Sequence, residues 1–276
     1  DKTILNIRIR YTKVMLQKDT KTDYLIFTDL DGTLLDHKTY ELNEAKEMLD
    51  FICKQKIPLI IVTSKTKDEV IELQKRLSVS FPFIIENGAG IFIPKGKEFE
   101  LISLGKSYES TIIAFEKYSK EFPIKGFHEM DEEEVSLYTG LSKDKAKKAK
   151  KRTFSEPFIL KDETKIEKLK QLALLDGFDV VKGGRFYHLI TLGQDKAKAV
   201  IEMKKYYENL YNKSFKTIAL GDGENDITML KCVDIPILIK KYDGTFIKCE
   251  IDNLTKSRFI GPKGWNDSLK RILNVK

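Results

Sequence analysis

The sequence predicts an α/β fold, in which a doubly wound parallel sheet carries an inserted, smaller α+β domain. Short apolar runs rich in Ile, Val and Phe alternate with longer segments of helical periodicity. Such alternation is typical of a parallel sheet covered by helices. The middle of the chain breaks it, with shorter mixed segments and the densest group of lysines. The 276 residues, 41% of them hydrophobic, suffice for a core of this size.

Five apolar runs are predicted to be strands. Each is short and bounded by polar residues or glycine, as expected of strands buried on both faces. A parallel arrangement follows because helical segments separate them. The runs are residues 24–27, 58–62, 81–85, 215–220 and 235–239.

Three segments between these runs show helical periodicity. The first, residues 43–54, has a possible cap at Asn43 and is followed by Pro58. The second is residues 67–77, and the third surrounds Val200. The apolar faces expected to point inward are Ala45, Met48, Leu49, Ile52 and Cys53; Val70, Leu73 and Leu77; and Val200, Met203, Tyr207 and Leu210.

The change in pattern predicts the domain boundaries. The main domain is expected to comprise residues 1–92 and 190–276, and the inserted domain residues 93–189. The insert begins near Gly96 and ends near Gly183 and Gly184. No function is assigned to residues 1 to about 20.

Composition narrows the function classes. The net charge of +7 arises from 49 basic and 42 acidic residues in a mixed distribution, so a small anionic substrate fits as well as nucleic acid. Three widely spaced cysteines without a CxxC pair argue against disulfides and a thiolate zinc site. No apolar run approaches the roughly 18 residues of a membrane span, and the first 16 residues lack the small-residue cleavage pattern expected of a secretory signal. We expect a cytoplasmic protein without a membrane or nucleic-acid partner.

Two carboxylates follow the first apolar run, in the stretch "YLIFTDLDGTLLD". Asp29 and Asp31 lie at the carboxyl end of a predicted strand, where parallel sheets bind ligands, and Gly32 permits a turn. Carboxylates this close repel one another unless a cation compensates them, and Mg²⁺ prefers such oxygen ligands. A calcium loop of EF-hand type is excluded, because Leu34 and Tyr40 occupy its glycine and glutamate positions.

Other predicted strand ends supply further polar groups. The stretch "IALGDGENDITML" brings Asp222 and Asp226, and "VTSKT" brings Ser64. In "GQDKAKAV", Lys196 opens a helix that Asp195 can cap. A hydroxyl, an ammonium group and a metal ion together suit a phosphate group.

The motifs "DLDGTLLD", "VTSK", "GQDK" and "GDGEND", in this order, resemble those of the haloacid dehalogenase (HAD) superfamily phosphatases. The resemblance implies a magnesium-dependent phosphatase that forms an aspartyl-phosphate. The implied catalytic roles are Asp29 as nucleophile, Asp31 as general acid and base, and Ser64 and Lys196 as phosphate-orienting residues. The implied metal site comprises Asp29, the backbone carbonyl of Asp31, and Asp222, with Asp226 holding Lys196 or a metal-bound water.

The insert resembles the larger caps of sugar phosphatases in this superfamily. Four segments, "ENGAGIFIP", "RTFSEPFIL", "GGRFYHLI" and "GPKGWNDSL", resemble the mannosyl-3-phosphoglycerate phosphatases, which implies a small sugar phosphate as the substrate. A glyceric acid that carries a phosphate and a sugar has a carboxylate, which would suit Arg152 or Arg185. Its hydroxyl groups would suit Asn87, Glu156 and His188.

Several alternatives stay open. The substrate could be another sugar phosphate, such as glucosyl-3-phosphoglycerate or sucrose phosphate. The chain could also be a phosphohexomutase, or a binding protein of the same fold without turnover. The run "KDKAKKAKKR" at 143–152 is interpreted as a packed helix with a solvated basic face. Trp265 is expected to anchor the C-terminal helix to the core, with stacking on a sugar as the alternative that stays open. His188 is as compatible with a structural role as with substrate contact.

Overall fold

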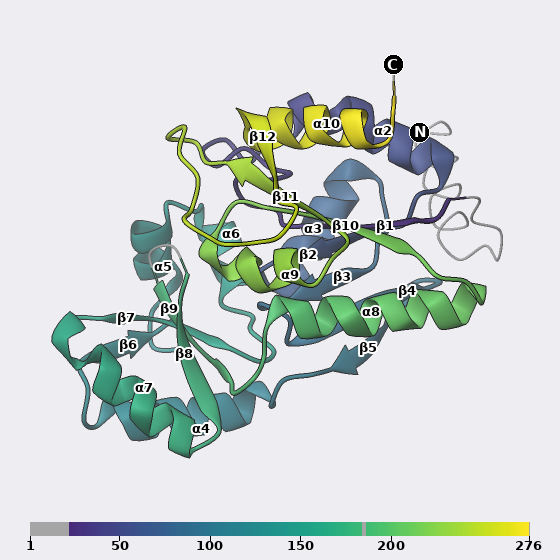
Figure 1. The fold of residues 1–276 in the computed structure, drawn as a ribbon. Helices are drawn as coiled ribbons and strands as arrows, with labels where there is room; N and C mark the ends of the chain where they lie inside the picture. The colour runs from purple at the N-terminus through teal and green to yellow at the C-terminus, as the bar shows by residue number, and fades with distance from the viewer. Residues whose placement is uncertain (1–21, 184–185, 276) are drawn as a thin grey trace.

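The structure, a computed structural model, describes residues 22–183 and 186–275 (Figure 1). It contains an eight-stranded sheet in the order β12-β11-β10-β1-β2-β3-β4-β5 and a four-stranded sheet in the order β6-β7-β9-β8. Helices cover the larger sheet, so the predicted α/β class is confirmed. The strands of the larger sheet are β1 Tyr24–Thr28, β2 Leu59–Val62, β3 Phe83–Ile85, β4 Gly90–Lys95, β5 Glu98–Ser103, β10 Lys216–Gly221, β11 Ile235–Lys240 and β12 Thr255–Ile260.

The helices and the strands of the smaller sheet complete the described secondary structure. The strands are β6 Ile124–Gly126, β7 Glu156–Leu160, β8 Phe178–Gly183 and β9 Phe186–Thr191. The α-helices are α2 Lys46–Gln55, α3 Lys67–Leu77, α4 Tyr108–Ser119, α5 Glu132–Thr139, α6 Lys143–Ala149, α7 Ile166–Leu175, α8 Lys196–Tyr211, α9 Ile227–Lys231 and α10 Gly261–Ile272. The short 3₁₀ helices are η1 Asn43–Ala45, η2 Glu163–Lys165 and η3 Glu224–Asp226.

The larger sheet is parallel from β12 to β3. Strands β4 and β5, which the sequence analysis did not predict as part of it, join its edge in antiparallel orientation. Short turns connect β3 to β4 and β4 to β5, and a short turn can join only antiparallel neighbours. The sheet therefore extends into the segment assigned to the insert.

The predicted domain boundaries need correction at the level of the strands. The boundary after residue 92 falls inside β4, and β5 also belongs to the larger sheet. At the other end, β9 continues to Thr191 as part of the smaller sheet, past the predicted end at residue 189. Hydrogen bonding between strands decides which domain each strand belongs to, and the composition of the sequence does not reveal that pairing. We refer to residues 106–191 as the cap.

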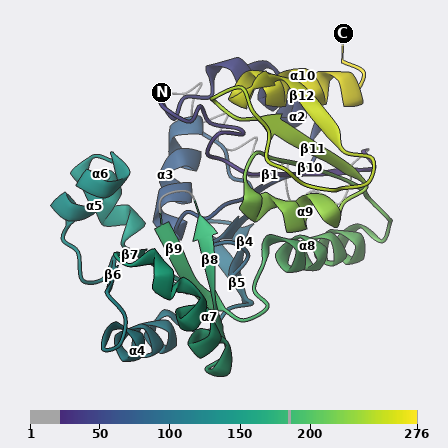
Figure 2. The same ribbon diagram turned by 60° about the vertical axis from the view of Figure 1, so that its left-hand side comes forward.

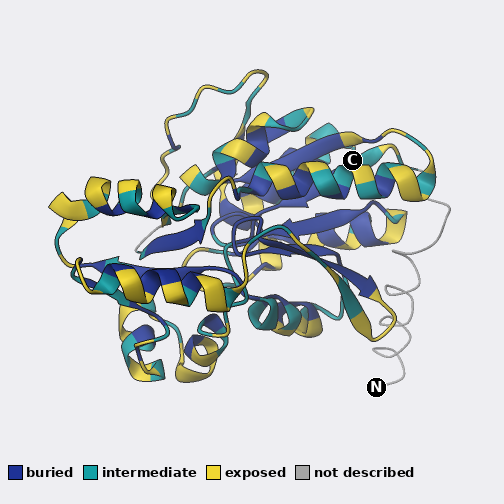
Figure 3. Cartoon of the chain, turned by 90° about the horizontal axis from the view of Figure 1, so that it is seen from below, coloured by how far each residue is buried: buried dark blue, intermediate teal, exposed yellow. Residues whose placement is uncertain are grey.

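Two layers of helices enclose the larger sheet (Figure 1). Helices α2, α3 and α10 contribute to the core on one face, and α8 and α9 to the core on the other. The strands are mostly buried and the helices expose one side (Figure 3). Trp265 of α10 is fully buried and donates from Nε1 to Oγ1 of Thr28 at 3.0 Å, as its predicted anchoring role requires. Leu210, predicted to point inward, is 39% exposed.

The order of strands places a ligand crevice. From β1 the chain proceeds to β2 and β3 on one side, whereas β10, β11 and β12 lie on the other. Strands β1 and β10 are parallel neighbours, so the connections at their carboxyl ends diverge and leave a crevice between them. Asp29 follows β1, and Asp222 follows β10.

The cap has its own apolar clusters. Helices α4 and α7 pack on one face of its antiparallel sheet. Helices α5 and α6 form a separate small cluster beside α3 (Figure 2), which includes Ala146 and Ala149. Lys148 and Lys151 pair with Glu72 and Asp68 of α3 at 2.8 and 2.7 Å. The lysine run is thus a packed helix with a basic face, as interpreted from the sequence.

Candidate active site

A buried lysine forms the centre of the crevice. Lys196, the first residue of α8, donates from Nζ to Asp29 Oδ1 at 2.7 Å and to Asp226 Oδ1 at 2.6 Å. The Asp195 side chain caps the helix by accepting from the Lys198 backbone N–H. Burial opposes the charge of Lys196, but Asp226 and Asp29 raise its pKa above the ordinary value. The lysine is therefore a fixed cation.

Three carboxylates surround this point. Oxygens of Asp29, Asp222 and Asp226 lie within 4.8 Å of one another. Burial raises the pKa of Asp29 well above its usual range, against the effect of Lys196. Burial and the nearby Asp226 raise the pKa of Asp222 to about 7. One ammonium group does not balance three carboxylates, so the cluster fits a divalent cation.

The three carboxylates are not equivalent. Both oxygens of Asp226 are engaged, Oδ1 by Lys196 and Oδ2 by the backbone N–H groups of Asp222 and Gly223. Asp29 and Asp222 remain the better oxygen ligands for a cation. Asp226 instead holds the lysine and the turn after β10.

Close packing explains the glycine after Asp31. Gly32 has a φ of +80°, and a Cβ there would lie 2.6 Å from Asp222 Oδ2. The next residue, Thr33, donates from Oγ1 to Asp222 Oδ1 at 3.1 Å. The two strand ends that carry Asp29 and Asp222 therefore fit together only with glycine at this position.

Asp31 lies beside this cluster and not within it. Its Oδ2 pairs with Lys65 Nζ at 2.8 Å, whereas its Oδ1 is buried without a hydrogen-bond partner among the described residues. Sequence reasoning missed Lys65, although it stands next to Ser64 in the quoted "VTSK". Ser64 follows β2, whose Val62 carbonyl accepts from Lys196, so it lies at the same sheet edge.

Two of the predicted substrate residues border the cluster. Asn87 donates from its backbone N–H to Thr63 O and accepts at Oδ1 from Asn225 Nδ2 at 3.2 Å. Arg152 of the cap donates from Nη2 to the carbonyl of Ser64 at 3.2 Å. The structure thus brings Asn87 and Arg152 to the edge that carries the catalytic candidates.

A glutamate that the sequence analysis did not select holds Arg152 in place. Glu86 is fully buried and lies 3.4 Å from Arg152 Nε. Its carboxylate also accepts from the side chain of Ser155 and from three successive backbone N–H groups of the cap, those of Thr153, Phe154 and Ser155. Its place in the sequence could have indicated a role, because Glu86 is the first residue of the quoted segment "ENGAGIFIP".

The remaining predicted substrate residues make no described contact with the cluster. Glu156 is fully buried and bonds to His128 and Tyr108 inside the cap. His188 is buried in the cap sheet, and its Nδ1 has no partner among the described residues. Arg185 lies outside the described residues. Their roles toward a substrate stay predictions.

A family model for haloacid dehalogenase-like hydrolases matches residues 26–244, which include all four motifs. The chain belongs to this family. A glucosyl-3-phosphoglycerate/mannosyl-3-phosphoglycerate phosphatase of Persephonella marina is 46% identical over 261 residues, covering 91% of this chain and 97% of the relative. A protein of the same name from Methanococcoides burtonii is 39% identical over 266 residues, with the same coverage.

A solved structure supports the fold of this HAD hydrolase. A HAD superfamily phosphatase of Bacteroides thetaiotaomicron aligns with a TM-score of 0.67 at 16% identity, covering 94% of this chain and 98% of that one. The family and the named relatives make the protein a phosphatase, a hydrolase of phosphoric monoesters, as predicted. None of the helices in the described ranges has both the length and the hydropathy that a membrane span requires.

Proposed function

We propose that this phosphatase is magnesium-dependent and hydrolyses glycosyl-3-phosphoglycerates, chiefly mannosyl-3-phosphoglycerate, to a glycosylglycerate and phosphate. One observation carries the chemistry: Lys196 holds Asp29 in the crevice between β1 and β10, with Asp222 beside it. The names of the two relatives support the substrate class.

In the first half of the reaction, Asp29 is the nucleophile. A carboxylate oxygen forms a bond to phosphorus while the ester oxygen leaves, which produces an aspartyl-phosphate. Asp31, in its protonated form, gives its proton to the departing alkoxide. Lys196 offsets the negative charge on the transferring group.

In the second half, water releases phosphate. Asp31 has lost its proton and now accepts one from the water, which attacks the phosphorylated intermediate and restores the Asp29 carboxylate. Asp29 and Asp222, with the backbone carbonyl of Asp31 as the resemblance implies, would hold Mg²⁺, which neutralises phosphate charge when bound. Asp226 keeps Lys196 directed at Asp29 throughout.

Release of phosphate from purified esters tests the proposal. We expect mannosyl-3-phosphoglycerate and its glucosyl counterpart to be hydrolysed well and sucrose phosphate poorly. Chelation with EDTA should abolish turnover, and Mg²⁺ should restore it. Full activity in EDTA would contradict the metal requirement. Equal rates on all three esters would contradict the substrate assignment.

A further inference from the structure

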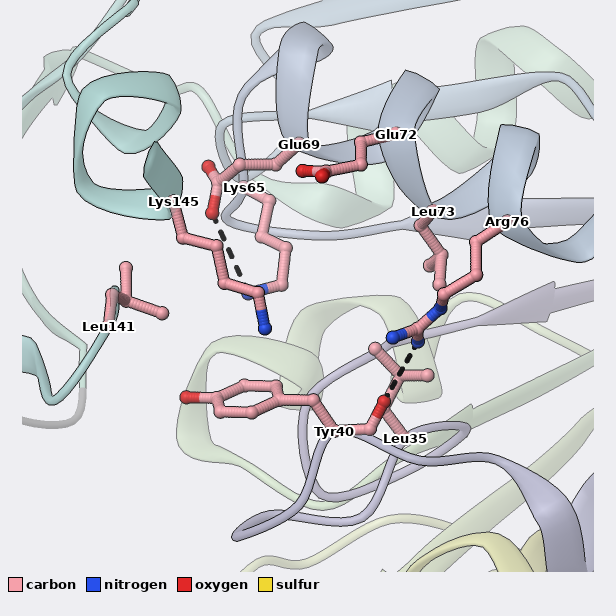
Figure 4. Close-up of a pocket in the computed structure, with 9 residues that line it drawn as sticks. All are labelled: Leu35, Tyr40, Lys65, Glu69, Glu72, Leu73, Arg76, Leu141 and Lys145. Atoms are coloured by element: carbon pink, nitrogen blue, oxygen red, sulfur yellow. Dashed lines mark hydrogen bonds and ion pairs between the residues drawn. The ribbon is translucent and has the colours of Figure 1, made fainter. Parts of the chain in front are cut away.

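A groove lies between the loop after Asp31, helix α3 and the cap (Figure 4). Leu35, Tyr40 and Lys65 line it from the main domain, and Leu141 and Lys145 line it from the cap. Its walls therefore come from both domains. The groove has its full lining only when the α5–α6 part of the cap lies against α3.

The groove borders the acid-base residue. Lys65 lines the groove and also holds Asp31 Oδ2 at 2.8 Å. The other oxygen, Oδ1, is buried and lacks a hydrogen-bond partner among the described residues. The oxygen that leaves phosphorus must lie within hydrogen-bond reach of Asp31 to receive its proton. A leaving group bound in the groove would lie beside Lys65 and therefore next to Asp31.

The groove is suited to an anion. The ammonium groups of Lys65 and Lys145 lie 5.3 and 5.4 Å from the centroid of the Tyr40 ring, and both point toward it in Figure 4. Two cations beside one ring repel each other, and an anion between them would remove that repulsion. Within the described part of the chain, Lys65 has carboxylate partners in Asp31 and Glu69, whereas Lys145 has no ion pair.

The other charged side chains of the groove are already engaged. Glu72 pairs with Lys148 at 2.8 Å, and Arg76 donates to the backbone carbonyl of Tyr40 at 3.0 Å. Arg152, one of the two arginines that the sequence analysis offered for the substrate carboxylate, is not among the residues that line the groove, and its guanidinium is held by Glu86, Ser155 and the carbonyl of Ser64. Lys145 is therefore the better placed cation for a carboxylate in this groove.

We propose that this groove is the leaving-group subsite and that Lys145 of the cap binds the carboxylate of the glycerate moiety. The inference rests on the proposed function and assigns its substrate selectivity to one side chain. Lys65 is a positioning residue that holds Asp31 between this subsite and the phosphoryl group. Because Lys145 belongs to the cap, an acidic leaving group would draw the cap toward the main domain.

Replacing Lys145 tests the assignment. The readout is the ratio of kcat/KM for mannosyl-3-phosphoglycerate to kcat/KM for p-nitrophenyl phosphate, an ester without a carboxylate. We expect Lys145→Glu to lower this ratio about 10- to 100-fold, the effect of losing a charge-assisted hydrogen bond. The change should be mainly in KM for the carboxylated ester, because the carboxylate is bound in the ground state as well.

Lys147 provides a matched control on the same helix, exposed and outside the groove. Lys147→Glu has the same charge change and should keep the ratio within about twofold of the wild type. Equal ratios for the two variants would overturn the subsite. If the wild-type enzyme hydrolyses p-nitrophenyl phosphate but neither glycosyl-3-phosphoglycerate, the proposed function itself fails, and the subsite falls with it.

Discussion

Buried or partly buried carboxylates occur in the crevice, at the joint between main domain and cap, and inside the cap, and their surroundings differ. Asp29 and Asp222 face like charges, and burial raises the pKa of each. Glu86, at the joint, and Glu156, inside the cap, are fully buried, and their carboxylates accept hydrogen bonds from several donors. A buried acid with enough donors holds structure together. One with too few donors is costly unless a ligand supplies the missing charge.

The crevice and the joint between main domain and cap also contribute differently to activity and stability. The crevice carboxylates are kept together at a cost in stability, because like charges repel in a buried environment. Glu86 joins the loop after β3 to the cap segment that contains Ser155, across the two sheets. We therefore expect substitutions in the crevice to remove activity without unfolding the protein. Substitutions at the joint should instead lower the free energy of unfolding.

The largest expected effect is on the nucleophile. Asp29→Asn retains the shape of the side chain but cannot form the aspartyl-phosphate, so kcat should fall by a factor on the order of 10⁴ or more. Lys196 keeps the Asp226 carboxylate as partner, so the fold should persist. Phosphate release and circular dichroism are the measurements.

An exposed aspartate serves as the control for this variant. Asp50 lies on the surface of α2 and pairs with Lys46, so Asp50→Asn should retain full turnover. Comparable activity in Asp29→Asn and Asp50→Asn would contradict the assignment of Asp29 as the nucleophile.

The next effect concerns the joint. Glu86→Ala leaves the Arg152 guanidinium, whose side chain is 3% exposed, without its carboxylate and three backbone N–H groups without an acceptor. The free energy of unfolding should fall by about 3–5 kcal/mol. Denaturant titration measures it.

Glu72→Ala is the matched variant, because it removes the exposed ion pair with Lys148 between α3 and the cap. Its cost should stay below about 1 kcal/mol, as for surface pairs in general. If both glutamates cost the same, burial and hydrogen bonding of Glu86 are not what holds the cap to the main domain.

The smallest effect is a pH dependence. Burial, together with Arg152, lowers the pKa of the His188 imidazole from 6.5 to about 3. Between these values the unfolded chain binds a proton that the folded protein does not, so the folded state loses stability as the pH falls from 6.5. The loss approaches about 1.4 kcal/mol per pH unit for this one group.

His188→Gln removes this titration and keeps a polar side chain in the cap sheet. The free energy of unfolding of this variant should therefore fall less steeply than that of the wild type between pH 6.5 and 5. The two slopes should differ by up to about 1.4 kcal/mol per pH unit, the contribution of one proton. Parallel pH profiles for the two proteins would show that His188 is protonated in the folded state.

Much of the main domain could be predicted, because it depends on local patterns. Apolar runs of strand length and helical periodicity are properties of neighbouring residues, and they located β1, β2, β3, β10 and β11 closely. The second half of β4 and all of β5 were assigned to the insert, because hairpin pairing at a sheet edge has no comparable periodic signal. The positions of Asp29, Lys196 and Asp222 followed from strand ends, motif order and the family resemblance together.

The sequence by itself determined the fold class, the family, and which residue types stand at the ends of the central strands. Only the tertiary structure decided how the charges are paired: that Lys65 holds Asp31, that Glu86 engages Arg152, and that Glu156 bonds within the cap. The physical reason is that hydrogen bonds and ion pairs act over a few ångströms. Residues far apart in the chain come within that range only after the sheets and helices have packed.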